Sequence, residues 1–139
     1  MSIVVIRAIY AAGAIFDAAI AALLLLPDAL AMVVGLAEVP SRLSERVGLA
    51  MASSLLFGWT GLLIWGLRSP VERRGVLLLT VFPVIMGLAL AVLAGWSGSY
   101  ISTAGAAMIW STQTLLSLLF ICAFLGAQRA AKQNEGQND

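Results

Sequence analysis

Four long apolar segments constrain the fold of this chain more than any other feature. They cover residues 3–26, 48–67, 76–94 and 104–127. As an α-helix, the first segment would be about 36 Å long, which exceeds the hydrocarbon thickness of a bilayer, about 30 Å. Hydrophobic residues make up 61% of the 139 residues and charged residues only 11%, a composition far from that of a soluble domain. We therefore expect an all-α fold, an integral membrane bundle of four transmembrane helices.

The chain is expected to form one domain over residues 1–132, followed by a polar, disordered tail over residues 133–139. Within the domain, Ser102 or Thr103 can cap the fourth helix. The residues Ser69-Pro70-Val71-Glu72 have the pattern of a helix start, with an N-cap serine, a proline in the first turn and a glutamate that reaches back.

A short helix is predicted at the membrane surface after the first span. Pro27 should end that span, because proline cannot continue a helical hydrogen-bond ladder. Asp28 can then cap a helix over residues 29–37, closed by Pro40. A helix of this length cannot cross the bilayer, so we expect it to lie on the non-cytoplasmic face.

The first span also has features of a secretory signal peptide. The residues Ala29-Leu30-Ala31 form a small-x-small cleavage pattern. However, Arg7 follows four apolar residues instead of opening the chain, Asp17 interrupts the apolar segment, and the segment is too long for the apolar region of a signal peptide. We therefore interpret it as a membrane span.

Two features of the middle spans concern helix packing. Ser54, Gly58 and Gly61 are small residues that would allow a neighbouring helix, or a second copy of the chain, to approach closely. Pro83 lies inside the third span, where it removes a backbone hydrogen bond, so a kink is expected there.

The composition argues against several classes of function. The chain has no histidine and one cysteine, Cys122, so it lacks the commonest general base, the commonest metal ligand and any thiol pair. We predict no catalytic residue, no metal site and no cofactor, and an enzyme is the third-ranked hypothesis. The formal net charge of +1, without a basic patch, gives no reason to expect nucleic acid. The expected partners are membrane lipids, an apolar small molecule, and a membrane protein or a second copy.

The arginines predict the orientation in the membrane. With four spans, both termini and the middle turn share one side, which carries six basic residues against two on the other side. Under the positive-inside rule, the N- and C-termini are then cytoplasmic. The six residues are Arg7, Arg68, Arg73, Arg74, Arg129 and Lys132, and the two are Arg42 and Arg46.

Asp17 is the sharpest candidate for a functional residue. A carboxyl group near the middle of a span is costly and usually faces the interior of a bundle. Arg7 lies ten residues away on another face of the helix, so it is no partner. Asp17 could bind a ligand or a proton, or could serve as polar glue between helices.

Gln113 is the predicted partner of Asp17. Counting from the centres of the predicted spans places both residues at the same depth, so the Gln113 amide could donate a hydrogen bond to a neutral Asp17 carboxyl. We predict a cavity among spans one, two and four, bordered by this pair and lined by Trp59, Trp110 and Thr112. The Trp59 indole could also donate to Asp17. The alternative is that these side chains only fill the core or hold the helices together.

The chain resembles the DoxX-like group of small bacterial four-helix membrane proteins. The resemblance covers about half of the chain. It implies a four-helix bundle of mostly uncharacterised function, sometimes a subunit beside redox enzymes, and no catalytic residue is implied. Small multidrug exporters share the four spans and an acid in the first helix, but they are shorter and their motif residues are absent here. The residues that resemble the DoxX-like group are Gly13 and Asp17, Leu26-Pro27-x-x-Leu30…Gly35-Leu36, and Gly58-Trp59…Arg68-Ser69-Pro70-x-Glu72-Arg73-Arg74.

These observations favour a protein of the bacterial inner membrane that binds an apolar ligand or lipid, or acts as an accessory subunit of a membrane complex. The alternative is a proton-coupled transporter of small molecules that uses Asp17.

Overall fold

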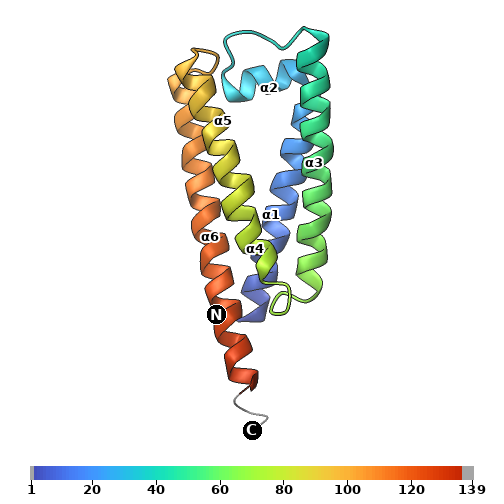
Figure 1. Ribbon diagram of the computed structural model, residues 1–139, viewed down its shortest axis with the longest axis vertical. Coiled ribbons are helices and arrows are strands. Elements are labelled where there is room, and N and C mark those ends of the chain that lie inside the picture. Colours follow the sequence, from blue (N-terminus) through green and yellow to red (C-terminus); the bar gives the residue numbers. More distant parts are fainter. Residues whose placement is uncertain (1, 136–139) are drawn as a thin grey trace.

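The computed structural model describes residues 2–135, and this part of the chain is built almost entirely from helices (Figure 1). Four helical segments are long and apolar enough to cross a membrane, which confirms the predicted all-α bundle of four transmembrane helices. The third of these segments, Gly75–Ser97, contains three consecutive elements. In chain order the elements are α1 (Ile3–Leu24), α2 (Pro27–Val34), α3 (Leu43–Arg68), α4 (Gly75–Leu79), the π-helix η1 (Thr80–Ile85), α5 (Met86–Ser97) and α6 (Thr103–Glu135).

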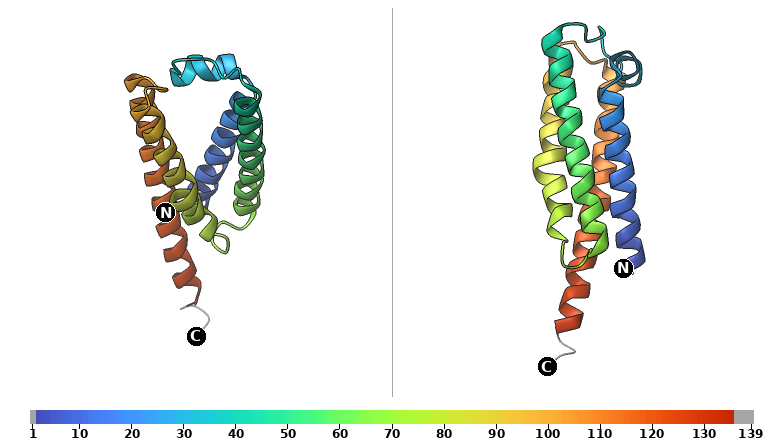
Figure 2. Two further views of the ribbon diagram at one scale, coloured as in Figure 1. Left: turned by 45° about the horizontal axis from the view of Figure 1, so that its top comes forward. Right: turned by 90° about the vertical axis from the view of Figure 1, so that its right-hand side faces the viewer.

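The four spans form two pairs. α1 packs along α3, and α6 packs along the segment made of α4, η1 and α5 (Figures 1 and 2). The start of α1, the end of α6 and the turn between α3 and α4 lie at one end of the molecule, which we name the terminal end. At the opposite end, the α2 end, α2 lies across the two pairs. The pairs are close together at the terminal end and spread apart toward α2.

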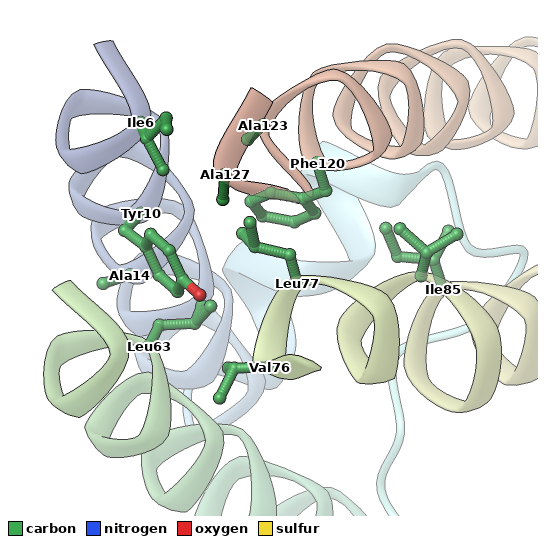
Figure 3. Close-up of a cluster of buried hydrophobic side chains, with 11 residues drawn as sticks. Ile6, Tyr10, Ala14, Leu63, Val76, Leu77, Ile85, Phe120, Ala123 and Ala127 are labelled. Carbon is green, nitrogen blue, oxygen red and sulfur yellow. The ribbon is translucent and has the colours of Figure 1, made fainter. Parts of the chain in front are cut away.

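The hydrophobic core lies where the two pairs meet. Side chains from α1, α3, α4 and α6 point toward one another there (Figure 3). Because lipid is as apolar as these side chains, the core is stabilised mainly by close packing. Its members are Ile6, Tyr10, Ala14, Leu63, Val76, Leu77, Val81, Ile85, Phe120, Ala123 and Ala127.

Small residues bring α1 and α3 into close contact. The Tyr10 ring packs against Gly66, where an added Cβ would overlap the ring. Nearer the α2 end, the Ser53 hydroxyl donates a hydrogen bond of 2.7 Å to the carbonyl oxygen of Ala21. Ser53 and Gly66 are both buried, so this face of α3 is the one that packs inside the molecule.

The face of α3 that carries Ser54, Gly58 and Gly61 is therefore not the one that packs inside the molecule, and its predicted alternative, contact with a second copy of the chain, stays a prediction. Ser54, Gly58 and Gly61 are exposed, and an added Cβ at either glycine would meet no atom within 4 Å. Ser53 is one residue away from Ser54, which is about 100° around the helix, so neighbouring residues belong to different faces. The pattern of small residues alone did not distinguish the two faces.

The helix after the first span begins earlier than predicted. α2 covers Pro27–Val34, with Pro27 in its first turn, so the same proline that ends α1 begins α2. Gly35 ends α2 in the left-handed conformation, with φ of 69°, before Pro40 is reached. In agreement with the prediction, this helix is too short to be a span and lies at the end of the bundle opposite the termini.

A two-stranded contact joins the end of α2 to the start of α6. The backbone N–H of Ala37 donates to the Tyr100 carbonyl and that of Ser102 donates to the Gly35 carbonyl, each at 2.9 Å. Gly105 packs directly on the carbonyl of Val34, where a Cβ would overlap the backbone. We name these contacts the α2–α6 clip. Because α2 continues from α1, the clip connects the two pairs at the α2 end.

The irregularity predicted at Pro83 takes the form of the π-helix η1. The wider turn of a π-helix contains one more residue than an α-helical turn, so the proline can be accommodated within a continuous span. The Thr80 hydroxyl donates to the Val76 carbonyl at 2.8 Å. The sequence indicated the position of the irregularity but not its π-helical form.

Several helix ends differ from the predictions. α3 begins at Leu43, and the Glu45 carboxylate accepts hydrogen bonds from the backbone N–H groups of Ser41 and Arg42, both at 3.0 Å.

Residues 69–74 form a turn, so the expected helix start at Ser69 was wrong and α4 begins at Gly75. α6 continues through residues 133–135 of the predicted disordered tail, and the rest of that tail lies outside the described residues. Ser102 caps α6, as expected, by accepting from the Gly105 N–H at 3.1 Å.

Candidate functional site

Asp17 lies half-buried on the face of α1 that is turned toward α3 and α6. Gly13, four residues before it, contacts Phe120 of α6 and Leu63 of α3. Ala21, four residues after it, accepts the hydrogen bond from Ser53. Residues spaced by four lie on one helix face, so Asp17 is placed between these two contacts. Its Oδ2 atom is buried and has no hydrogen-bond partner among residues 2–135.

Gln113 lies on α6 and is the second polar side chain without a partner. Its Oε1 atom is buried and accepts no hydrogen bond from the described part of the chain. Gln113 lines a groove of about 320 Å³ between α6 and the segment formed by η1 and α5, which we name the η1–α6 groove. The groove is lined by Val81, Ile85, Met86, Ala89, Trp110, Gln113, Thr114, Ser117 and Leu118.

The structure does not contain the predicted hydrogen bond between Asp17 and Gln113, since the buried oxygen of each has no partner. The contact of Gly13 with Phe120 sets the register between α1 and α6. The two helices are antiparallel, so Asp17, four residues after Gly13, is level with Leu116, four residues before Phe120. Gln113 is three residues closer to the α2 end, which is about 4.5 Å along the helix axis. The prediction placed the two side by side because it counted from the centres of the predicted spans, whereas the register between α1 and α6 is set by the contact between the helices.

Trp59 has a partner that the sequence prediction did not assign to it. Its indole Nε1–H donates a hydrogen bond of 3.0 Å to the hydroxyl of Thr80, which in turn donates to Val76. These two hydrogen bonds link α3 to the third span beside the core. Thr80 is buried, and its position three residues before Pro83 was the available signal for a role in this region. The expected hydrogen bond from Trp59 to Asp17 is therefore replaced by one to Thr80.

Trp110 and Thr112 differ in their surroundings. Trp110 lines the η1–α6 groove, and its ring packs edge-on against Trp96 with 5.8 Å between the ring centroids. Its Nε1–H points to the Ala89 carbonyl at 3.5 Å. Thr112 donates its hydroxyl to the Met108 carbonyl within its own helix, at 2.9 Å. Of the five candidate residues, Trp110 and Gln113 line this groove, whereas Asp17, Trp59 and Thr112 do not.

A second hollow, of about 230 Å³, lies between α1 and α6. Its walls are apolar, so it contains no group that could orient a polar ligand. It is lined by Val5, Ala8, Ile9, Ala12, Gly13, Leu116, Leu119 and Phe120.

The described residues include no group of three or more histidine, cysteine, aspartate or glutamate side chains that could hold a metal ion.

Comparison with known proteins finds no family model, no curated protein and no solved structure that matches the chain. The candidate functional features of the described residues are therefore the η1–α6 groove and Asp17.

Proposed function

We propose that the protein binds an amphiphilic molecule of the bilayer, with an apolar body and one hydroxyl group, in the η1–α6 groove. The observation that supports this most directly is the Gln113 amide, which lines an otherwise largely apolar groove and has a carbonyl oxygen without a partner. A buried polar atom left without a hydrogen bond costs about 1–3 kcal/mol. A ligand that supplies the missing bond recovers part of this free energy, so the groove favours a molecule with a polar group over a plain hydrocarbon.

The adjoining π-helix also supports a binding role. Short π-helical segments inside α-helices occur frequently at functional sites. Here η1 contributes Val81 and Ile85 to the wall of the groove, facing the polar stretch of α6 that includes Thr114 and Ser117. A hydroxyl group can both donate and accept, and an amide offers both functions as well, so either orientation of the Gln113 amide can be used.

Native mass spectrometry tests this proposal. The full-length protein in detergent is titrated with 1-hexadecanol and, separately, with hexadecane, two probes that differ by the hydroxyl group. We expect the wild-type protein to bind the alcohol more tightly, and Gln113→Leu to weaken the alcohol about fivefold while leaving the alkane unchanged. Ser111→Ala is the matched control, because Ser111 is exposed on the same helix. Equal affinities of wild type and Gln113→Leu for the alcohol would refute the role of the amide.

The proposal also places the protein among the DoxX-like proteins of the bacterial inner membrane, with cytoplasmic N- and C-termini, and includes a role as accessory subunit of a membrane complex. The supporting observations are the resemblance in the first half of the chain and the excess of basic residues at the terminal end. A topology reporter fused to the C-terminus should report the cytoplasm, and a reporter signal from the other side would overturn the orientation. Crosslinking in the native membrane should yield a defined partner if the accessory role holds.

Asp17 supports a second candidate function, a proton-coupled transporter. A carboxyl group inside a span, with a buried oxygen that has no partner among the described residues, can take up and release a proton during transport. Reconstituted vesicles with a pH gradient test this: proton flux should depend on the transported molecule and should be lost in Asp17→Asn. Flux that persists in this variant would exclude Asp17 as the coupling residue.

A further inference from the structure

The turn between α3 and α4, residues 69–74, is held firmly against α1. The Tyr10 hydroxyl donates a hydrogen bond of 2.9 Å to the backbone carbonyl of Arg73, and the Arg73 N–H donates to the Ser69 carbonyl at 2.9 Å. Tyr10 is fully buried in the core, and Pro70 in the turn is also buried. The position of the Arg73 backbone is therefore determined by the best-packed part of the molecule.

The side chain of Arg73 is held as well. Its guanidinium carbon lies 3.9 Å from the centre of the Trp65 ring, and its Nη1 donates to the Trp65 carbonyl. In the same turn, Nη1 of Arg74 donates to the Val71 carbonyl at 2.9 Å. Both guanidinium groups thus bond to backbone carbonyls. A guanidinium has five N–H donors in a planar fork, so several donors on each remain for an anion.

These groups lie at the level where lipid headgroups are found. Trp65 and Arg68 belong to the last turn of α3, at the end of an apolar span, and Trp65 is 48% exposed. Tryptophan at the end of a span is typical of the membrane–water interface. The preceding residue, Ile64, is 47% exposed and belongs to the lipid-facing surface. An anion bound here could therefore continue into an acyl chain along α3.

The charge of this segment is unbalanced. Residues 68–74 contain three arginines and one acid, Glu72, for a net charge of +2. A phosphodiester headgroup would offset part of this charge, and its oxygens match the spacing of the guanidinium donors.

We propose that Arg68, Arg73 and Arg74 form a binding site for the phosphate group of an anionic phospholipid. Arg73, held over Trp65, is the central ligand, and Arg68 and Arg74 contribute from either side along the chain. Restraint of the guanidinium groups before binding reduces the entropy lost when the lipid is bound. This differs from a general attraction of basic residues to an acidic leaflet, because it depends on the geometry of Arg73 and not only on its charge.

The test compares lipids bound to the purified full-length protein by native mass spectrometry. The probes are dioleoyl phosphatidylglycerol and dioleoyl phosphatidylcholine, which share their acyl chains. We expect wild type to prefer phosphatidylglycerol. Loss of one cationic contact in Arg73→Gln should weaken this lipid about fivefold. Arg73→Lys, which keeps the charge but not the planar fork, should also bind measurably less.

Arg129→Gln is the matched control, because it removes a positive charge from the same end of the molecule but on another helix, α6. Its affinity should stay within about twofold of wild type, a change well below one cationic contact. The Arg68→Gln variant provides a second reading if Arg73→Gln does not fold, since Arg68 is exposed in the final turn of α3. Equal weakening by Arg68→Gln and Arg129→Gln, or an unchanged affinity in Arg73→Lys, would overturn the site in favour of diffuse surface charge. Displacement of the lipid by millimolar inorganic phosphate would instead identify a soluble anion as the ligand.

Discussion

The terminal end and the α2 end of the bundle are built from the same kinds of helix but differ in how their polar groups are satisfied. At the terminal end, the Tyr10 hydroxyl bonds to Arg73 beside a close-packed core, and nearer the middle of the bundle the Trp59 indole bonds to Thr80. Toward the α2 end, Asp17 and Gln113 each have a buried oxygen without a partner. The contrast indicates that close packing inside the bundle is concentrated near the terminal end, whereas the buried polar atoms left for a ligand inside the bundle lie further toward α2.

The difference follows from the spreading of the two helix pairs. Where α1 and α6 are in contact, the Phe120 ring packs against Gly13, and apolar packing fills the space between the helices. Closer to α2, the pairs are separated and are joined through the α2–α6 clip instead of through side chains. In that region one buried oxygen of Asp17 and one of Gln113 have no hydrogen-bond partner among the described residues.

The largest expected effect is at the terminal end. Leu63 is fully buried, and Leu63→Ala should lower the free energy of unfolding by about 3 kcal/mol, because the cavity removes packing contacts that lipid does not replace. Leu55→Ala, on the exposed face of the same helix, should change it by less than about 1 kcal/mol. Unfolding in mixed detergent micelles measures both values. Similar losses for the two variants would contradict the assignment of the core to this end.

The clip is tested by Gly105→Ala. A methyl group at this position overlaps the Val34 carbonyl, so α2 must move away from α6, at a cost of about 2 kcal/mol. Hydrogen exchange at the amides of Ala37 and Ser102 should then become faster. Gly58→Ala is the control, since a Cβ there meets no neighbour within 4 Å. If exchange at these amides were unchanged in Gly105→Ala, the clip would contribute little to the position of α2.

A smaller effect is expected for the Trp59–Thr80 hydrogen bond. Trp59→Phe keeps an aromatic ring but removes the N–H donor, and should lower the free energy of unfolding by about 1 kcal/mol. Combining it with Thr80→Val in a double-mutant cycle separates the hydrogen bond from the packing of each side chain. Additive effects of the two substitutions would show that the bond contributes nothing by itself.

The smallest effect, and the one of opposite sign, is expected at Gln113. Gln113→Leu replaces an amide without a partner by an apolar side chain of similar size, so the free energy of unfolding should rise by about 0.5 kcal/mol in the absence of ligand. The same unfolding measurement detects it. A loss of more than about 1 kcal/mol would indicate that Gln113 has a structural role, because removing an amide without a partner should remove no favourable interaction.

Hydropathy and helix length predicted the number of spans and the position of the surface helix, because both depend on local composition over many residues. Prolines were predicted less well. Pro27 was predicted to end α1, and it also begins α2. The kink at Pro83 stays a prediction, and the π-helix η1 at that position was not predicted. These outcomes depend on which backbone groups neighbouring residues satisfy, and a single sequence does not specify that.

The candidate site was predicted only in part. The sequence identified Asp17 and Gln113 as costly polar residues inside the membrane, and both have a buried oxygen without a partner. Their pairing was wrong because it required the relative register of α1 and α6, which is set by the contact of Gly13 with Phe120. The rotation of α3, which buries Ser53 and exposes Ser54, was equally inaccessible, since both residues are small and polar.

The α2–α6 clip has a consequence for the order in which the protein can be assembled. A chain made from its N-terminus presents α2 well before residues 100–102, so the Gly35 carbonyl and the Ala37 N–H bond to water until the third span has been inserted. The segment of residues 100–102, just before α6, then forms its hydrogen bonds with residues 35–37, just after α2. Insertion of the fourth span is thereby the event that ties the two halves of the protein together.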